Sequence, residues 1–222
     1  MKLRVGLISA GFLFLISFVD KPALAGPWTQ EKGSLYINYS SVWTKFDSVR
    51  LFNGNRKYVG NVRTLSHDFL MKYGVLENLD VHIQAPYELA SIEGDPTATS
   101  RGFGDGSLGV QYRFLRENEN FPVSAAVGFE WKTPLSSYRD DKLSSLGDHN
   151  VDYEYRFLVG RYFDVFQKTS YINVEGGYRT RTGKPADEVF GFGEVGMLFT
   201  PKVAGRIFVD GVDALGGSEL WC

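Results

Sequence analysis

The sequence predicts an all-β fold, an antiparallel up-and-down transmembrane β-barrel (a meander) with about nine or ten strands present. Apolar and polar residues alternate with a period of two in many segments, which is typical of strands with two different faces. The connections between these segments are alternately long and short. Beyond residue 25, no apolar run approaches the roughly 20 residues that a membrane-spanning helix needs. If this chain enters a membrane, it therefore does so as strands.

The first 25 residues predict a secretory signal peptide. Lys2 and Arg4 precede the uncharged apolar stretch 5–19, which is shorter than the roughly 20 residues of a membrane anchor. An Ala-Leu-Ala sequence follows, and we expect cleavage between Ala25 and Gly26. Residues 26–222 are then one barrel domain, and the single cysteine of the chain cannot form an internal disulfide.

The expected strands each carry one apolar face and one polar face. Clean alternation occurs at 34–40, 79–89, 107–114, 123–132, 151–160, 172–179 and 203–210. The segments 63–74 and 188–199 are less regular, and the second is apolar on both faces. A soluble β-sandwich also alternates, with its apolar face inward, so the pattern alone leaves both architectures open.

The connections favour a barrel. Long ones are expected at 46–62, 91–104, 133–149 and 182–187, and short ones at 75–79, 116–121, 164–169 and 200–202. Outer-membrane barrels carry long loops on the outer rim and short turns on the periplasmic rim. Aromatic residues near the expected strand ends suit the girdles of such barrels, although they could also fill an ordinary β-core: Trp43, Tyr73, Tyr87, Trp131, Phe163 and Phe199. We therefore expect the cell outer membrane, with its lipid and the barrel assembly machinery as partners.

Residues Gly104–Gly109 fit the G-x-G-x-x-G pattern of a dinucleotide-binding loop. That loop needs a preceding strand and a following helix, whose N-terminus binds the phosphate. Here residues 93–101 are rich in turn formers, and residues 107–114 alternate with a period of two. We expect these glycines to open a strand.

Two stretches resemble a known family. Tyr73–Tyr87 resembles the "YG-turn-strand-PY" block, and Gly102–Leu115 the "GxGDxxLGxxYRF" block, of the outer-membrane transporter family named "MetA-pathway of phenol degradation". Looser matches extend the resemblance over about residues 27–213. It implies a Gram-negative barrel related to fatty-acid and aromatic-hydrocarbon channels, with passive, porin-like uptake of small hydrophobic or aromatic molecules. It assigns no substrate-contacting residue.

The end of the sequence departs from such barrels. Single-chain bacterial barrels have an even number of strands and end in the periplasm, whereas nine strands that start there end outside. After about residue 212 no clean strand is visible. We expect a barrel that is incomplete at its C-terminus; the alternative is an irregular tenth strand.

If the apolar faces contact lipid, the polar faces line the lumen. The predicted lumen-lining residues are Asp80, His82, Gln111, Arg113, Glu130, Asp152, Glu154, Arg156, Glu175, Arg179 and Arg206. Pairs such as Arg113 with Glu130 and Glu154 with Arg179 would either form a polar wall along a solute path or fill a narrow barrel. The inward glycines would allow bends in the sheet or keep space open: Gly109, Gly128, Gly160 and Gly177. Gly26–Lys32, with Trp28, could reach into the lumen from the periplasm.

Other functions have weaker signals. A hydrolase would need a nucleophile and a base, and the candidates are Ser144 or Ser145 with Asp148-His149, in an expected loop where such a set arises easily by chance. His67 and His82 are expected in strands. Asp47, Asp140 and Asp141 suit a solvated loop better than a Ca²⁺ site. We expect no enzyme and no cofactor, and the slight acidic excess argues against nucleic acid. A structural or surface-interaction barrel is the main alternative to a channel, ahead of a soluble secreted β-protein.

Overall fold

The computed structural model describes residues 7–16, 26–50, 56–93, 98–135, 150–183, 186–200 and 203–215. Regular structure in this part of the chain is entirely β-strand. The strands are β1 (Leu7–Ile16), β2 (Leu35–Arg50), β3 (Arg56–Leu76), β4 (Leu79–Glu93), β5 (Ala98–Phe103), β6 (Asp105–Leu115), β7 (Ser124–Pro134), β8 (Asp152–Val165), β9 (Lys168–Arg181), β10 (Glu188–Thr200) and β11 (Val203–Ala214).

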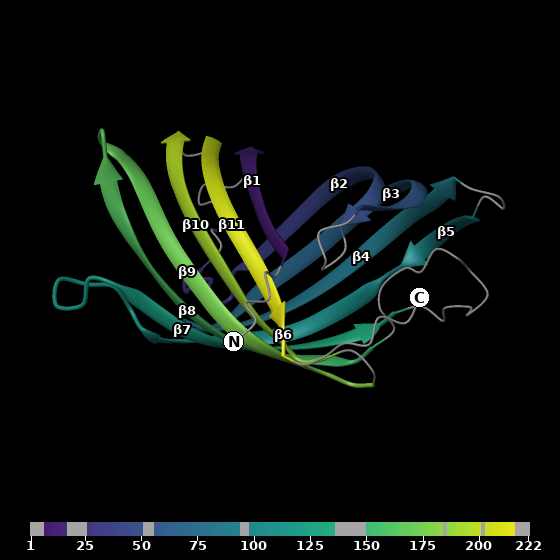
Figure 1. Cartoon of the computed structure of the whole chain (residues 1–222). Coiled ribbons are helices and arrows are strands. Elements are labelled where there is room, and N and C mark those ends of the chain that lie inside the picture. Colours follow the sequence, from purple (N-terminus) through teal and green to yellow (C-terminus); the bar gives the residue numbers. More distant parts are fainter. Residues whose placement is uncertain are drawn as a thin grey trace.

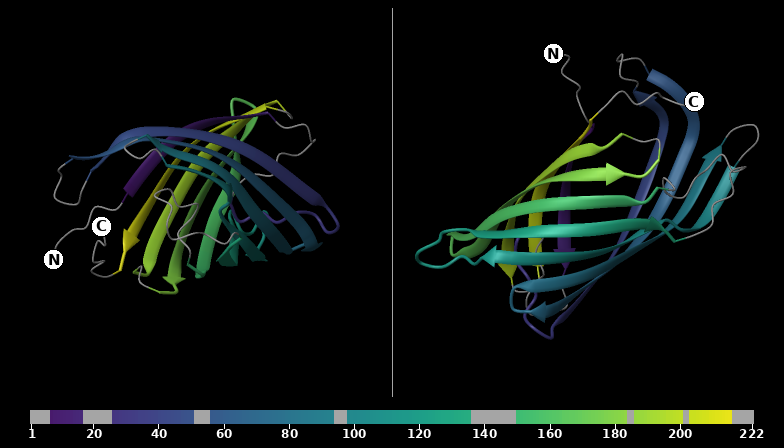
Figure 2. Two further views of the ribbon diagram at one scale, coloured as in Figure 1. Left: turned by 90° about the vertical axis from the view of Figure 1, so that its right-hand side faces the viewer. Right: turned by 90° about the horizontal axis from the view of Figure 1, so that it is seen from below.

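The strands form a single antiparallel sheet that is curled into a half-barrel (Figures 1 and 2). The order is β1-β11-β10-β9-β8-β7-β6-β4-β3-β2, and β5 pairs with β4 beside this path. From β2 to β11, strands that follow one another in the chain are neighbours in the sheet, except that β5 and β6 both pair with β4. This is the up-and-down arrangement of outer-membrane barrels. The predicted fold class is confirmed.

The nine predicted strands correspond to β2–β4 and β6–β11, but the outer connections differ from expectation. Residues 46–62 were expected as a long loop, yet the β2–β3 ladder continues to the pair Arg50↔Arg56. Residues 91–104 were also expected as a loop, yet they contain β5. Both expectations were wrong because polar residues beyond the apolar band can keep pairing as a twisted hairpin.

Gly104 separates β5 from β6, which lie one after the other along β4. β5 pairs with β4 between Tyr87 and Ile92, and β6 pairs with β4 between Leu79 and Gln84. The Gly104 N–H donates to the carbonyl of Pro86 at 3.0 Å, and the Gly104 carbonyl accepts from Leu135 N–H at 3.2 Å. The glycine pattern thus opens β6, as predicted, but the residues before Gly104 form β5 where a loop was expected.

The segment expected as a signal peptide contains β1. It pairs antiparallel with β11, from Leu7↔Val212 to Ile16↔Val203. In lipid, the free edge of β11 would leave backbone groups without partners, so pairing with an apolar strand is favourable. Signal cleavage and an incomplete C-terminus stay predictions.

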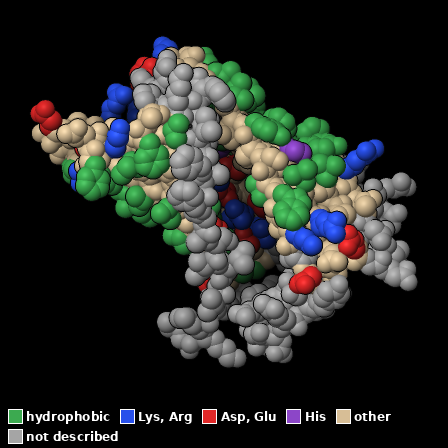
Figure 3. All heavy atoms as spheres, turned by 90° about the horizontal axis from the view of Figure 1, so that it is seen from above, with side chains coloured by type: hydrophobic (Ala, Val, Ile, Leu, Met, Phe, Trp, Pro, Cys, Tyr) green, Lys and Arg blue, Asp and Glu red, His purple; other side chains and the backbone are tan. Residues whose placement is uncertain are grey.

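The two faces of the sheet differ as expected. Large apolar side chains on one face are exposed; Ile37 is 61% exposed, Val127 44% and Trp131 40%. The opposite, concave face holds most of the buried polar side chains, and Figure 3 shows charged atoms gathered in the hollow with hydrophobic side chains outside. These are called the outer and inner faces below. Among the described residues, no helix is long and apolar enough to cross a bilayer.

Candidate functional site

Arg156 on β8 is the centre of an ion-pair network on the inner face. Its Nη2 lies 3.0 Å from Oε2 of Glu130 on β7, and its Nη1 lies 3.3 Å from Oε1 of Glu175 on β9. Arg156 also contacts Glu154 on its own strand. One guanidinium thus links carboxylates of three neighbouring strands.

His82 extends this network across an intervening strand. Its Nε2 lies 3.2 Å from Oε2 of Glu130, although β6 runs between β4 and β7. The residue between them in the register is Gly109, and a Cβ there would lie 2.3 Å from His82 Nε2. Gly109 therefore makes room for the histidine ring; of the two roles expected for the inward glycines, it keeps space open.

The network continues toward the ends of β8–β10 that carry the longer connections, at 135–151 and 182–187. Arg179 Nη2 lies 2.6 Å from Glu154 Oε2, and Arg179 Nη1 lies 2.7 Å from Glu188 Oε2. The predicted pair Glu154–Arg179 is confirmed. Farther along, Lys132 Nζ lies 2.9 Å from Asp152 Oδ2.

The predicted pair Arg113–Glu130 is wrong. Glu130 lies opposite Gly109, and Arg113 lies opposite Ala126, next to an irregularity in the β6–β7 register. Arg113 instead donates from Nη2 to the carbonyl of Glu77 at 2.7 Å. Its guanidinium therefore stabilises the β3–β4 turn by a hydrogen bond to a backbone carbonyl.

A separate cluster lies between β9 and β11. Glu194 accepts a hydrogen bond from the Tyr171 hydroxyl at 2.6 Å and lies 2.9 Å from Nη1 of Arg206. Tyr171 and Glu194 are almost fully buried, at 1% and 2% exposure. This cluster ties three strands together at the turn end of the sheet.

Residues 26–31 lie on the inner face near this turn end. Gln111 Nε2 donates to the carbonyl of Gly26 at 3.1 Å, and the Thr29 hydroxyl donates to the carbonyl of Glu77 at 2.9 Å. The backbone N–H of Gln30 lies 2.9 and 3.0 Å from the two carboxylate oxygens of Asp80. The segment is therefore bonded to β4, β6 and the β3–β4 turn.

Trp28 packs the same segment against the opposite wall. Its ring centroid lies 4.4 Å from that of Tyr162 on β8 and 5.7 Å from that of Tyr171 on β9. A Cβ at Gly160 would lie 3.0 Å from Trp28 and Pro27, so the glycine permits this close approach. Residues 26–31 span the inner face from β9 to β4, as the sequence suggested for Gly26–Lys32.

Aromatic side chains on the inner face were not singled out from the sequence. Phe190 lies under Arg179 and Arg156, with guanidinium carbons 5.4 and 5.9 Å from its ring centroid. Phe192 and Phe208 stack at 6.1 Å. The feature of the sequence that could have identified them is the segment 188–199, which is apolar on both faces, so that one of its apolar faces must point inward.

The structure brings the predicted lumen residues to one face. All lie on the inner face, by burial, ion pairs or register: Asp80, His82, Gln111, Arg113, Glu130, Asp152, Glu154, Arg156, Glu175, Arg179 and Arg206. That they line a conducting lumen stays a prediction. The hydrolase candidates Ser144, Ser145, Asp148 and His149, the loop residues Asp140 and Asp141, and Ala25 lie outside the described residues. His67 lies in β3, where its Nδ1 is 2.7 Å from the Tyr39 hydroxyl.

Asp187, in the loop before β10, fixes the C-terminal end of β9. It accepts a hydrogen bond from the Tyr178 hydroxyl and one of 3.0 Å from the Arg181 N–H, and these bonds hold the pKa of its carboxyl below the ordinary value. Within the part of the chain that the structure describes, no group of His, Cys, Asp and Glu side chains could hold a metal ion.

Comparison with known proteins supports the fold. No family model matches the chain, and no curated protein matches it, so the resemblance to the "MetA-pathway of phenol degradation" family stays a prediction. Among solved structures, the chain is similar to the COG4313 outer membrane channel from Pseudomonas putida F1, with a TM-score of 0.52 and 14% sequence identity. The match covers 88% of this chain and 100% of that one. The protein has the fold of an outer-membrane β-barrel.

Proposed function

We propose that the protein is an outer-membrane channel for the passive uptake of small hydrophobic or aromatic molecules. The observation that carries this proposal is the inner face itself, a charged wall crossed by residues 26–31 with Trp28 at their centre. A sheet that is apolar outside and polar inside separates lipid from a water-accessible path. The similarity to a channel structure supports the same function.

The chemistry of the inner face favours uncharged solutes with aromatic or apolar groups. The guanidinium groups of Arg156 and Arg179 are already paired with carboxylates, so they offer little free charge to an ionic solute. Aromatic rings lie among these ion pairs, including Phe190, Phe192 and Phe208. Rings of this kind bind other aromatic groups by offset or edge contacts.

In this proposal, residues 26–31 narrow the path at the turn end. Their polar contacts are made mainly by the backbone, whereas Trp28 contributes the largest side chain. Replacing Trp28 by Ala would remove the ring while leaving the bonds to Asp80 and Gln111. We expect the path to widen without release of the segment.

Uptake of N-phenyl-1-naphthylamine by Gram-negative cells tests the proposal, because the outer leaflet slows this uncharged aromatic probe. Cells that carry the protein should take up the probe faster than cells without it, and Trp28→Ala should raise the rate further. Trp131→Ala is the matched control, since Trp131 is 40% exposed on the outer face. Uptake that is the same with and without the protein would overturn the channel and favour a structural or surface-interaction barrel.

A further inference from the structure

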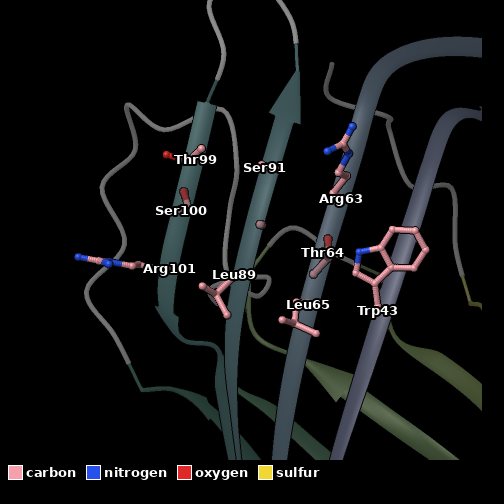
Figure 4. Close-up of a pocket in the computed structure, with 10 residues that line it drawn as sticks. Trp43, Arg63, Thr64, Leu65, Leu89, Ser91, Thr99, Ser100 and Arg101 are labelled. Atoms are coloured by element: carbon pink, nitrogen blue, oxygen red, sulfur yellow. The ribbon is translucent and has the colours of Figure 1, made fainter.

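A second candidate site lies away from the inner face, where β2–β5 approach the rim with the longer connections. A cavity of about 750 Å³ lies among these four strands. Its lining includes Trp43, Arg63, Leu65, Leu89 and Arg101, which come from neighbouring strands (Figure 4). Two arginines and a tryptophan thus border the same space.

The register places these side chains on the outer face. Trp43 pairs with Leu65, Leu65 with Leu89, and Leu89 with Arg101. Directly paired residues of neighbouring strands point to the same side of a sheet, and so do residues two apart in one strand. Arg63 and its partner Lys45 therefore share this side with Trp43. It is also the side of the exposed Ile37 and Tyr39.

The paired residues Trp43, Leu65, Leu89 and Arg101 mark the border of the apolar band on the side of the connections 51–55 and 94–97. On β4 the outer residues run from Leu79 through Ile83 to Leu89, and then become Ser91 and Glu93. The ten steps from Leu79 to Leu89, at about 3.3 Å each and tilted by about 40°, rise about 25 Å, which is the height of the apolar band of a bacterial barrel. Trp43 therefore lies at the aromatic girdle, and Arg63 lies at the level of the lipid headgroups.

The charge of this border is mainly positive. Arg63 Nη2 lies 2.8 Å from Oε1 of Glu93, with both side chains nearly half exposed. Within the described part of the chain, Lys45 and Arg101 form no ion pair, and both are exposed. The three cations outnumber the outward carboxylates Glu93 and Asp47. Cationic side chains at a lipid surface attract phosphate, and a guanidinium can bind it through two parallel hydrogen bonds. Among the described residues, Arg101 is free to do so, and Arg63 uses only its Nη2 for Glu93, so its remaining N–H groups are available.

We propose that Lys45, Arg63 and Arg101, with Trp43 below them, bind the phosphorylated headgroup of the glycolipid of the outer leaflet. The phosphates would contact the guanidinium groups, while the acyl chains would lie along Trp43, Leu65 and Leu89. We assign the site to the outer leaflet because outer-membrane barrels carry their longer loops on the outer rim. Here the connections 51–55 and 94–97 lie at the rim of the site, and the short turn 77–78 lies at the opposite rim. The proposal rests on the place of the fold in the outer membrane and not on transport.

Binding of bisphosphorylated lipid A to the purified full chain in detergent tests this proposal. Native mass spectrometry would measure the bound fraction for lipid A, for the same lipid without phosphates, and for inorganic phosphate as a competitor. We expect Arg101→Gln to weaken lipid A binding about tenfold, and Arg63→Gln with Arg101→Gln to weaken it further, since a charge-assisted hydrogen bond contributes about one factor of ten. Arg63→Lys with Arg101→Lys should retain part of the affinity because the charge remains.

The matched control is Arg161→Gln, which removes an exposed outer-face arginine on β8 near the opposite rim. It should leave lipid A binding unchanged, and heat-modifiable gel migration should show that every variant is folded. The proposal is overturned if Arg101→Gln behaves like Arg161→Gln, or if the lipid without phosphates binds equally well. Displacement of lipid A by low concentrations of inorganic phosphate would also overturn it, because the site would then bind a free anion.

Discussion

Replacing Arg156 by Met should lower the free energy of unfolding by about 2 to 4 kcal/mol, because Glu130 and Glu175 on the inner face lose the positive charge of Arg156. Methionine keeps much of the aliphatic length of the side chain and removes only the guanidinium. Glu130 and Glu175 lose contacts of 3.0 and 3.3 Å, whereas Glu154 keeps Arg179 at 2.6 Å.

The magnitude follows from burial. Breaking a fully buried ion pair by removing one partner costs about 3 to 5 kcal/mol. The side chains of Glu130 and Glu175 are 14% and 13% exposed, but that of Arg156 is 31% exposed, which lowers the expected cost. An exposed pair should be worth less than about 1 kcal/mol, and Arg63 with Glu93 is such a pair, at 47% and 43% exposure.

The assay is urea unfolding in phosphatidylcholine vesicles, followed by tryptophan fluorescence and heat-modifiable gel migration. Arg63→Met is the matched control, and Glu175→Gln added to Arg156→Met should recover part of the loss. If Arg156→Met and Arg63→Met give the same small change, the inner ion pairs do not hold the sheet together, and the reasoning is refuted.

Three further predictions concern other parts of the sheet. Tyr171→Phe should cost about 1 to 2 kcal/mol in the same unfolding assay, since Glu194 loses a buried bond of 2.6 Å; an unchanged stability would mean that water replaces the hydroxyl. Changing Phe166-Gln167 to Asn-Gly should raise the free energy of unfolding by up to about 1 kcal/mol. Both residues have positive φ, of 49° and 59°, in a two-residue turn that favours Asn-Gly. A lower free energy of unfolding would show that the exposed Phe166 has another role. The Asp187 carboxyl has a lowered pKa, so its hydrogen bonds stabilise the loop at pH values above 3.8, the ordinary pKa, and are lost as the pH falls through the folded pKa. Amide exchange at Arg181 should therefore speed up in acid more in the unchanged protein than in Asp187→Asn. Identical pH profiles of exchange in the two proteins would contradict this.

The alternation in the sequence was enough to predict the strands and their two faces. A period of two is a local property, and each strand of a lipid-facing sheet must show it separately. The outer residues Val127 and Trp131 and the inner residues Glu130 and Arg156 all lie on the predicted sides. The contact of residues 26–31 with the inner face also followed from position, since they directly precede the first predicted strand.

Register could not be predicted in the same way. The β6–β7 ladder places Glu130 opposite Gly109, and this offset depends on the conformation of residues 116–123 and on an irregularity near Leu115. β5 and the inward aromatic rings could not be predicted from the sequence either, because both depend on which residues lie beside them in the sheet. β5 continues the line of β6 beyond Gly104, and the inward rings of Phe190 and Phe208 look like any apolar strand residue until their neighbours are known.

The central claim, that Trp131 faces lipid while Trp28 lies inside, is tested most directly by fluorescence quenching with brominated lipids. Two variants would each retain a single tryptophan, Trp131 or Trp28, with the others replaced by Phe, in vesicles whose acyl chains carry bromine. The account predicts strong quenching of Trp131, which is 40% exposed on the outer face, and little quenching of Trp28, which packs against Tyr162 and Tyr171. Strong quenching of Trp28 with none of Trp131 would contradict the assignment of the two faces.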